Sequence, residues 1–147
     1  DGTGYRLGAG VEVDVEAFTK ALAARPPLWP AIASLYRGDL LADLPLAEWC
    51  FGARDTLRNR FVDAAVSAGE TALAQRDHGA ARSAFERAIE TDATCEPAVQ
   101  GLMRTLVLTG DAPRALRLFQ RFTETLEREL GLGPSEETLR LAKRLAG

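Results

Sequence analysis

One sequence pattern occurs twice at a fixed spacing, and it constrains the fold more than any other feature. Asp77-His78-Gly79-Ala80-Ala81, with Phe85 and Ala88, is matched by Asp111-Ala112-Pro113-Arg114-Ala115, with Phe119 and Phe122. Equivalent positions such as Asp77 and Asp111 lie 34 residues apart. A period of about 34 residues is typical of repeats in which each unit is two helices joined by a turn. The sequence therefore predicts an all-helical repeat.

The residue types at the repeated positions fit the close packing of tetratricopeptide-like units. Gly69 and Ala81 are small residues, expected where the two helices of the first unit approach each other. Met103 takes the place of Gly69 in the second copy, so the helices of that unit are expected to lie further apart. Phe85 and Phe119 are both expected to be buried between helices. We therefore expect an all-α, tetratricopeptide-like, right-handed repeat of about seven helices.

Size and charge limit the functions open to this chain. Its 147 residues suffice for one domain, and no apolar run approaches the roughly 18 residues that cross a membrane. A formal net charge of −3 argues against a fragment that binds nucleic acid directly. We expect a cytoplasmic protein that does not associate with membranes. Because the chain begins Asp1-Gly2 without an initiator methionine, we also expect it to be part of a longer protein.

The sequence lacks the motifs of an enzyme. It has no Gly-rich phosphate loop, nucleophile elbow or cluster of metal ligands, and its one histidine, His78, falls in a predicted turn. Cys50 and Cys95 are 45 residues apart and are expected to be buried thiols rather than a disulfide. No catalytic activity, cofactor or metal is predicted.

The N-terminal third is expected to contain one extended segment followed by short helices. Residues 1–13 alternate apolar and polar side chains with glycines between them, which predicts an extended arm, while residues 14–147 form the helical domain. Asp14 is expected to cap the first helix, and Arg25-Pro26-Pro27 to end it. Pro30 can begin a second helix that ends at Gly38.

Longer helices are predicted for the rest of the chain. One is expected from Pro45 to about Gln75, with a kink at Phe51-Gly52, and a final short helix is expected to start with Ser135 as its cap. The last helix should pack on the repeats through Leu139, Leu141, Ala142 and Leu145. The predicted repeat helices are His78–Thr91, Glu96–Leu108 with Thr94 as cap, and Ala112–Leu130 ending at Gly131.

Three aromatic residues could join the N-terminal helices to the repeats. Tyr36 and Trp49 are expected to pack together, whereas Trp29, which lies among prolines, is expected to be the most exposed of the three. An alternative is that one of these rings is an exposed anchor for a partner.

Several segments, taken together, resemble the bacterial transcriptional activator domain, the helical module of SARP-type regulators. The resemblance covers about Val13 to Leu145. The sequence departs from the family's pattern at Cys50-Phe51-Gly52, where the family usually has charged helix formers. The segments are Leu35-Tyr36-Arg37-Gly38-Asp39-Leu40-Leu41-Ala42-Asp43, Glu48-Trp49, the repeat pair, and Glu129-Leu130-Gly131-Leu132-Gly133-Pro134-Ser135.

The resemblance implies a role in regulating transcription through protein partners. In that family a winged-helix DNA-binding domain precedes the module and ends in a strand similar to Gly4-Tyr5-Arg6-Leu7. The arm would then be the last strand of that domain. The implied partners are the winged-helix domain, a second copy of the protein as a homodimer, and RNA polymerase.

A generic adaptor that binds an extended peptide is the competing interpretation. Its groove would be lined by the first helix of each repeat. Capturing a terminal carboxylate would require several basic or amide side chains there, and of these residues only Arg104 is suitable. The expected groove residues are Asp63, Val66, Ser67, Glu70, Gln100, Arg104 and Leu108.

A second candidate surface lies on the predicted helix 112–130. Arg114, Arg117 and Arg121 are spaced to lie along one side of it. They form either a solvated face or a docking ridge for an acidic partner surface.

Overall fold

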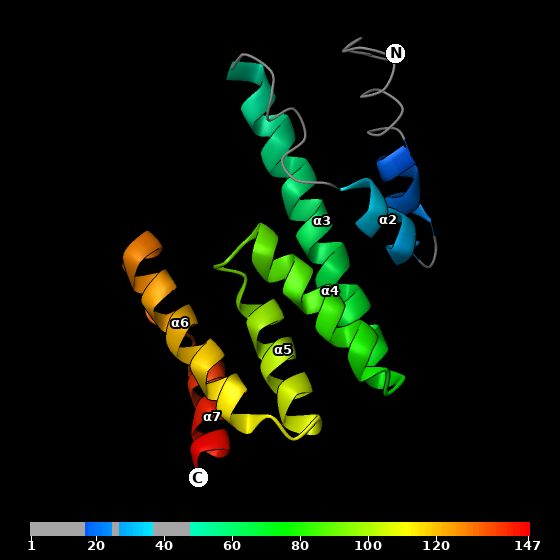
Figure 1. Ribbon diagram of the computed structural model, residues 1–147. Coiled ribbons are helices and arrows are strands. Elements are labelled where there is room, and N and C mark those ends of the chain that lie inside the picture. Colours follow the sequence, from blue (N-terminus) through cyan, green and yellow to red (C-terminus); the bar gives the residue numbers. More distant parts are fainter. Residues whose placement is uncertain (1–16, 25–26, 37–47) are drawn as a thin grey trace. The chain divides into compact units, whose positions relative to one another are not determined.

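All elements within the described residues are helices. The computed structural model describes residues 17–24, 27–36 and 48–147, so the predicted extended arm, the Asp14 cap and Gly38 lie outside them. The all-helical fold is confirmed, and α3 continues without interruption through Phe51 and Gly52, where a kink was predicted. After a helix at residues 17–23 come α2 (Trp29–Leu35), α3 (Glu48–Ala74), α4 (His78–Thr91), α5 (Glu96–Leu108), α6 (Ala112–Leu130) and α7 (Glu136–Ala146) (Figure 1). None of these helices could cross a membrane.

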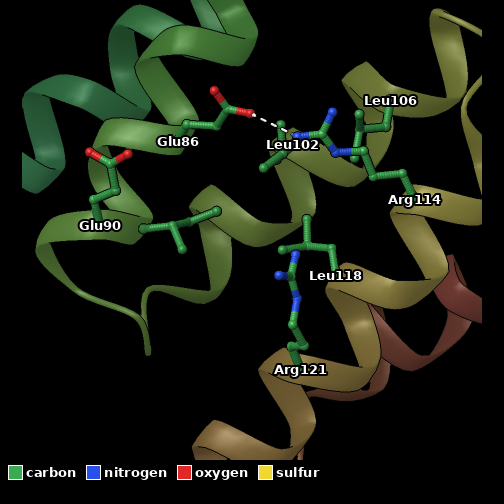
Figure 2. Close-up of a pocket in the computed structure, with 8 residues that line it drawn as sticks. Glu86, Glu90, Leu102, Leu106, Arg114, Leu118 and Arg121 are labelled. Atoms are coloured by element: carbon green, nitrogen blue, oxygen red, sulfur yellow. Dashed lines mark ion pairs between the residues drawn. The ribbon is translucent and has the colours of Figure 1, made fainter.

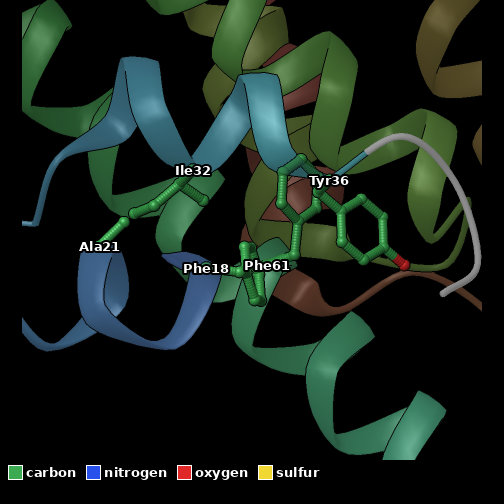
Figure 3. Close-up of a cluster of buried hydrophobic side chains, with 5 residues drawn as sticks. All are labelled: Phe18, Ala21, Ile32, Tyr36 and Phe61. Atoms are coloured by element: carbon green, nitrogen blue, oxygen red, sulfur yellow. The ribbon is translucent and has the colours of Figure 1, made fainter. Parts of the chain in front are cut away.

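The chain divides into two compact units, residues 1–64 and 65–147. The core of the first unit is an aromatic cluster (Figure 3). The rings of Tyr36 and Phe61 stack with centroids 4.2 Å apart, and Phe18 packs beside them. Trp29 is half-buried with its ring 5.6 Å from that of Phe61, and it is more exposed than the buried Tyr36, in line with the expected order of these two residues. The side chain of Trp49 is not among those described.

Helix α2 is shorter than its sequence suggested. Pro30 lies in its first turn, where the missing N–H costs nothing. The helix ends at Leu35, because Tyr36 adopts extended backbone angles while its N–H still donates to the carbonyl of Ile32. The prediction that Gly38 ends this helix was therefore wrong. This early end leaves the Tyr36 ring within the aromatic cluster.

The second unit is organised around the ring of Phe85. This residue is completely buried, and its ring lies against Gly69 of α3 and Gly101 of α5. A Cβ atom built on Gly69 would come within 2.5 Å of the ring, and one on Gly101 within 2.3 Å. The predicted close approach at Gly69 is confirmed, whereas the equal requirement at Gly101 was not predicted. Along this unit α4 packs on α5, α5 on α6, and α7 on both α5 and α6 (Figure 1).

The two repeat turns have the same construction. Asp77 and Asp111 each cap a helix, accepting hydrogen bonds from the backbone N–H of Ala80 and Arg114 at 3.0 and 3.2 Å. The residues just before them, Arg76 and Gly110, both have positive φ, of 60° and 83°. The repeat therefore copies the turn as well as the helices.

Two predicted details of the repeat helices were wrong. Cys95, not Thr94, is the N-cap of α5, because the Thr94 hydroxyl donates to the carboxylate of Asp92 at 2.7 Å. Phe119 is half-buried rather than buried. The buried face of α6 follows a three- and four-residue spacing that places Phe119 at its edge. This face consists of Ala115, Leu118, Phe122 and Leu126.

Candidate protein-interaction surfaces

A groove of about 300 Å³ lies over α5, between α4 and α6 (Figure 2). Four apolar residues form its floor and four charged residues its walls. The acidic residues come from α4 and the basic residues from α6, so the two walls have opposite charge. The lining residues are Glu86, Ile89, Glu90, Leu102, Leu106, Arg114, Leu118 and Arg121.

Helical spacing explains why these side chains meet. Glu86 and Glu90 are one turn apart on α4, as are Leu102 and Leu106 on α5. Since α4 and α6 both pack on α5, the leucines of α5 lie between the two charged rows. The volume is at the lower end of the roughly 300–1,000 Å³ usual for binding pockets. The groove can therefore accept a few side chains of a partner.

The two ends of the groove differ in charge pairing. At one end, Glu86 accepts a hydrogen bond from Arg82 at 2.9 Å and lies 3.7 Å from Arg114 (Figure 2). Toward the other end, Glu90 and Arg121 are exposed, and neither forms an ion pair with another described residue. One end is thus neutralised within the chain, while the other presents an acid and a base on opposite walls.

The three arginines predicted to form a ridge on α6 have different environments. Arg114 and Arg121 line the groove, whereas Arg117 is exposed on α6 and is not a lining residue. Arg114 is engaged by Glu86, which leaves Arg117 and Arg121 as the more accessible cations. Docking of an acidic partner on the three arginines stays a prediction. Glu86 and Glu90 were not predicted from the sequence, because an α4 carboxylate facing α6 has no signal in local spacing.

The residues predicted to line a peptide groove form several contacts within the second unit. Glu70 and Arg104 form an ion pair between α3 and α5. Gln100 donates a 2.7 Å hydrogen bond to the hydroxyl of Thr138 in α7. Ser67 and Leu108 are exposed, and Val66 is half-buried. Asp63, which is exposed, belongs to the first unit.

A polar network holds the N-terminus of α7 on α5. One carboxylate oxygen of Glu96 accepts from the Ser135 N–H at 2.7 Å and from the Thr138 hydroxyl. Burial alone would raise the pKa of Glu96, but hydrogen bonds from Thr138 and Ser135 outweigh it, so the pKa is lowered. Ser135 also caps α7, as predicted, by accepting from the Thr138 N–H. Glu96 and Thr138 were not singled out from the sequence.

The outer face of α7 is mostly charged. Thr138 and Ala142 are its buried residues, and Leu141 and Leu145 are half-buried. Leu139 is 40% exposed, so its predicted role in packing α7 on the repeats was wrong. A shallow depression on this helix is lined by Glu137, Arg140, Lys143 and Arg144.

Comparison with known proteins adds one finding. A family model described as the bacterial transcriptional activator domain matches residues 13–146. No curated protein and no solved structure matches the chain. Among the described residues, no cluster of three or more His, Cys, Asp or Glu side chains could hold a metal ion.

Proposed function

The chain belongs to the bacterial transcriptional activator domain family, and we propose that it is the protein-interaction module of such an activator. In this proposal a winged-helix DNA-binding domain precedes the module, and residues 1–13 contribute its last strand. The module would act by self-association and by contacts with that domain or with RNA polymerase. The observation that supports it most is the charged groove between α4 and α6, whose residues Glu90 and Arg121 have no ion-pair partner in the described chain.

The exposed arginines of α6 provide a reason for binding an acidic surface. Arg117 and Arg121 are two residues whose charges are not neutralised by a described neighbour. Charges at the rim of an interface mainly increase the association rate and select partners of opposite charge. An acidic face of RNA polymerase or of the DNA-binding domain would meet this requirement.

Contacts on the predicted peptide-binding face favour the activator module over a peptide adaptor. A peptide bound there would compete with the Glu70–Arg104 ion pair and with the Gln100–Thr138 hydrogen bond. The Gln100–Thr138 bond is part-buried, and a buried polar group that loses its partner costs about 1–3 kcal/mol, whereas the exposed Glu70–Arg104 pair contributes about 1 kcal/mol or less. A peptide would have to replace these contacts before gaining affinity.

The decisive experiment reverses two charges in an activator that contains this domain. Arg117→Glu combined with Arg121→Glu should lower reporter transcription by roughly tenfold, with a larger loss at low salt in vitro. Thermal stability should change little, because both side chains are exposed. A matched double reversal of exposed arginines, Arg60→Glu with Arg128→Glu, should leave transcription near the wild-type level. Equal output from the two double variants would refute the docking role.

A further inference from the structure

The outer face of α7 carries acidic, apolar and basic side chains that could pair with those of the groove between α4 and α6. Leu139 is a partly exposed apolar residue near the middle of the helix. Acidic Glu136 and Glu137 precede it, and basic Lys143 and Arg144 follow it. The groove has an apolar floor with an acidic wall on α4 and a basic wall on α6. Each surface therefore presents the charges that the other could neutralise.

The charges and the leucine of α7 lie along one side of that helix. Glu136, Leu139 and Lys143 follow a three- and four-residue spacing, and Glu136 and Lys143 are about 10.5 Å apart along the helix axis. A helix laid across the groove would place its acidic N-terminal turn beside Arg121 and its basic C-terminal turn beside Glu90. Leu139 would then lie over the leucines of α5. No ion pair within the described residues uses Glu90, Arg121 or Lys143, and Glu136 would give up only its exposed pair with Arg140, which costs little.

We propose that the groove between α4 and α6 binds α7 of a second copy of this chain. This inference rests on the proposed function and deepens it by naming one partner for the groove. The surfaces in contact are different on the two copies, α7 on one and the groove on the other. Such heterologous contacts form a closed assembly if they are reciprocated and a chain of subunits if they are not.

A charge-swap experiment tests the pairing of Lys143 with Glu90. In the Glu90→Lys variant, the acidic wall of the groove gains a positive charge and repels Lys143 of every other copy. In the Lys143→Glu variant, α7 is repelled by the native Glu90. Each variant alone should therefore associate at least about fivefold more weakly than the wild-type chain, as judged by sedimentation velocity over a concentration series.

An equimolar mixture of the two variants should restore association. In the mixture, the altered groove meets the altered helix, and the native groove of one variant meets the native helix of the other. Both kinds of contact are then attractive. Glu127→Lys, an exposed reversal on α6 outside the groove, is the matched control and should associate like the wild type. Far-UV circular dichroism checks that all variants remain helical.

The outcomes separate this inference from the proposed function. A wild-type chain that stays monomeric, variants that associate normally, or a mixture as dissociated as its components would each overturn the docking of α7. Transcription with the Arg117 and Arg121 reversal and association in the mixture are separate readouts, and of the two arginines only Arg117 lies outside the groove. Loss of transcription with no rescue in the mixture would leave the activator function standing and dismiss α7 as the occupant.

Discussion

Phe85 of α4 packs its ring against both α3 and α5, because each of those helices has a glycine at the point of contact. Gly69 and Gly101 come from α3 and α5, and an added Cβ on either would overlap the ring. The repeat pattern predicted the position of Phe85 and the small residue at 69. It did not predict Gly101, because the equivalence at 34 residues relates position 101 to Ser67 rather than to another glycine. Spacing alone cannot show which neighbouring helix a ring will touch.

Substituting alanine for glycine should lower the stability of the chain at position 101 and raise it at position 52. Gly101→Ala should destabilise the chain by about 1–3 kcal/mol, because the methyl group forces the buried Phe85 ring out of place. Gly52→Ala in α3 should stabilise it by about 0.5–1 kcal/mol, because nothing lies within 4 Å of the new Cβ and alanine favours the helix. Urea titration of both variants checks this. Equal effects at the two positions would show that the ring is not confined.

Arg76 carries backbone strain that its counterpart avoids. Both Arg76 and Gly110 adopt left-handed backbone angles, which cost a non-glycine residue about 1–2 kcal/mol. Arg76→Gly should therefore stabilise the chain by about 0.5–1 kcal/mol after the added flexibility of the unfolded state is counted. Gly110→Ala should destabilise it by a similar amount. Denaturant midpoints measure both, and a loss of stability in Arg76→Gly would contradict the argument.

Among the elements, the repeat helices were the most predictable. The bounds of α4, α5 and α6 agree with those expected, because aspartate caps and a C-terminal glycine mark ends in the sequence itself. Contacts between helices were less predictable. Ranking by hydrophobicity chose Leu139 for the buried face of α7, whereas the structure buries Thr138 through its hydrogen bonds with Glu96 and Gln100. The acidic wall of the groove was missed for a similar reason.

The packing of α7 on α5 within one chain should weaken in acid. The folded-state pKa of Glu96 lies below its ordinary value of 4.5, so the ionised form favours the folded state. This stability is fully present above the ordinary pKa, and it is lost as the pH falls through the lowered pKa. The protection of α7 amides against hydrogen exchange, taken relative to the intrinsic exchange rate at each pH, should therefore fall more steeply below about pH 4.5 in the wild type than in Glu96→Gln.

The glutamine variant provides the control for this effect. It keeps a carbonyl acceptor but cannot titrate, so the contribution of Glu96 to the pH dependence should vanish. At neutral pH it should already lose about 1 kcal/mol of α7 stability, since hydrogen bonds to a charged acceptor are stronger than those to an amide. Parallel exchange curves for the two proteins would show that this carboxylate does not control the attachment of α7.

Across the whole molecule, the two units were predictable to different degrees. The second unit has an internal repeat, which reveals both its helices and their order. The first unit has no repeat, and its core joins Phe18, Tyr36 and Phe61 from segments that are well separated in sequence. The stacking of Tyr36 on Phe61 was not predicted, because order in the chain does not determine which ring faces which, and the expected pairing of Tyr36 with Trp49 stays a prediction. Helix α3 contributes residues to both units, since their boundary follows Ala64.

The matching turns at Arg76-Asp77 and Gly110-Asp111 determine which length changes the chain can accept. A single residue deleted within α4 rotates every later side chain by about 100° relative to the preceding ones. A deletion before Phe85 would thus turn the ring away from both Gly69 and Gly101. Adding a whole 34-residue unit would instead preserve every cap and every turn. Surviving insertions and deletions between Asp77 and Asp111 should therefore come as complete repeats rather than as short gaps.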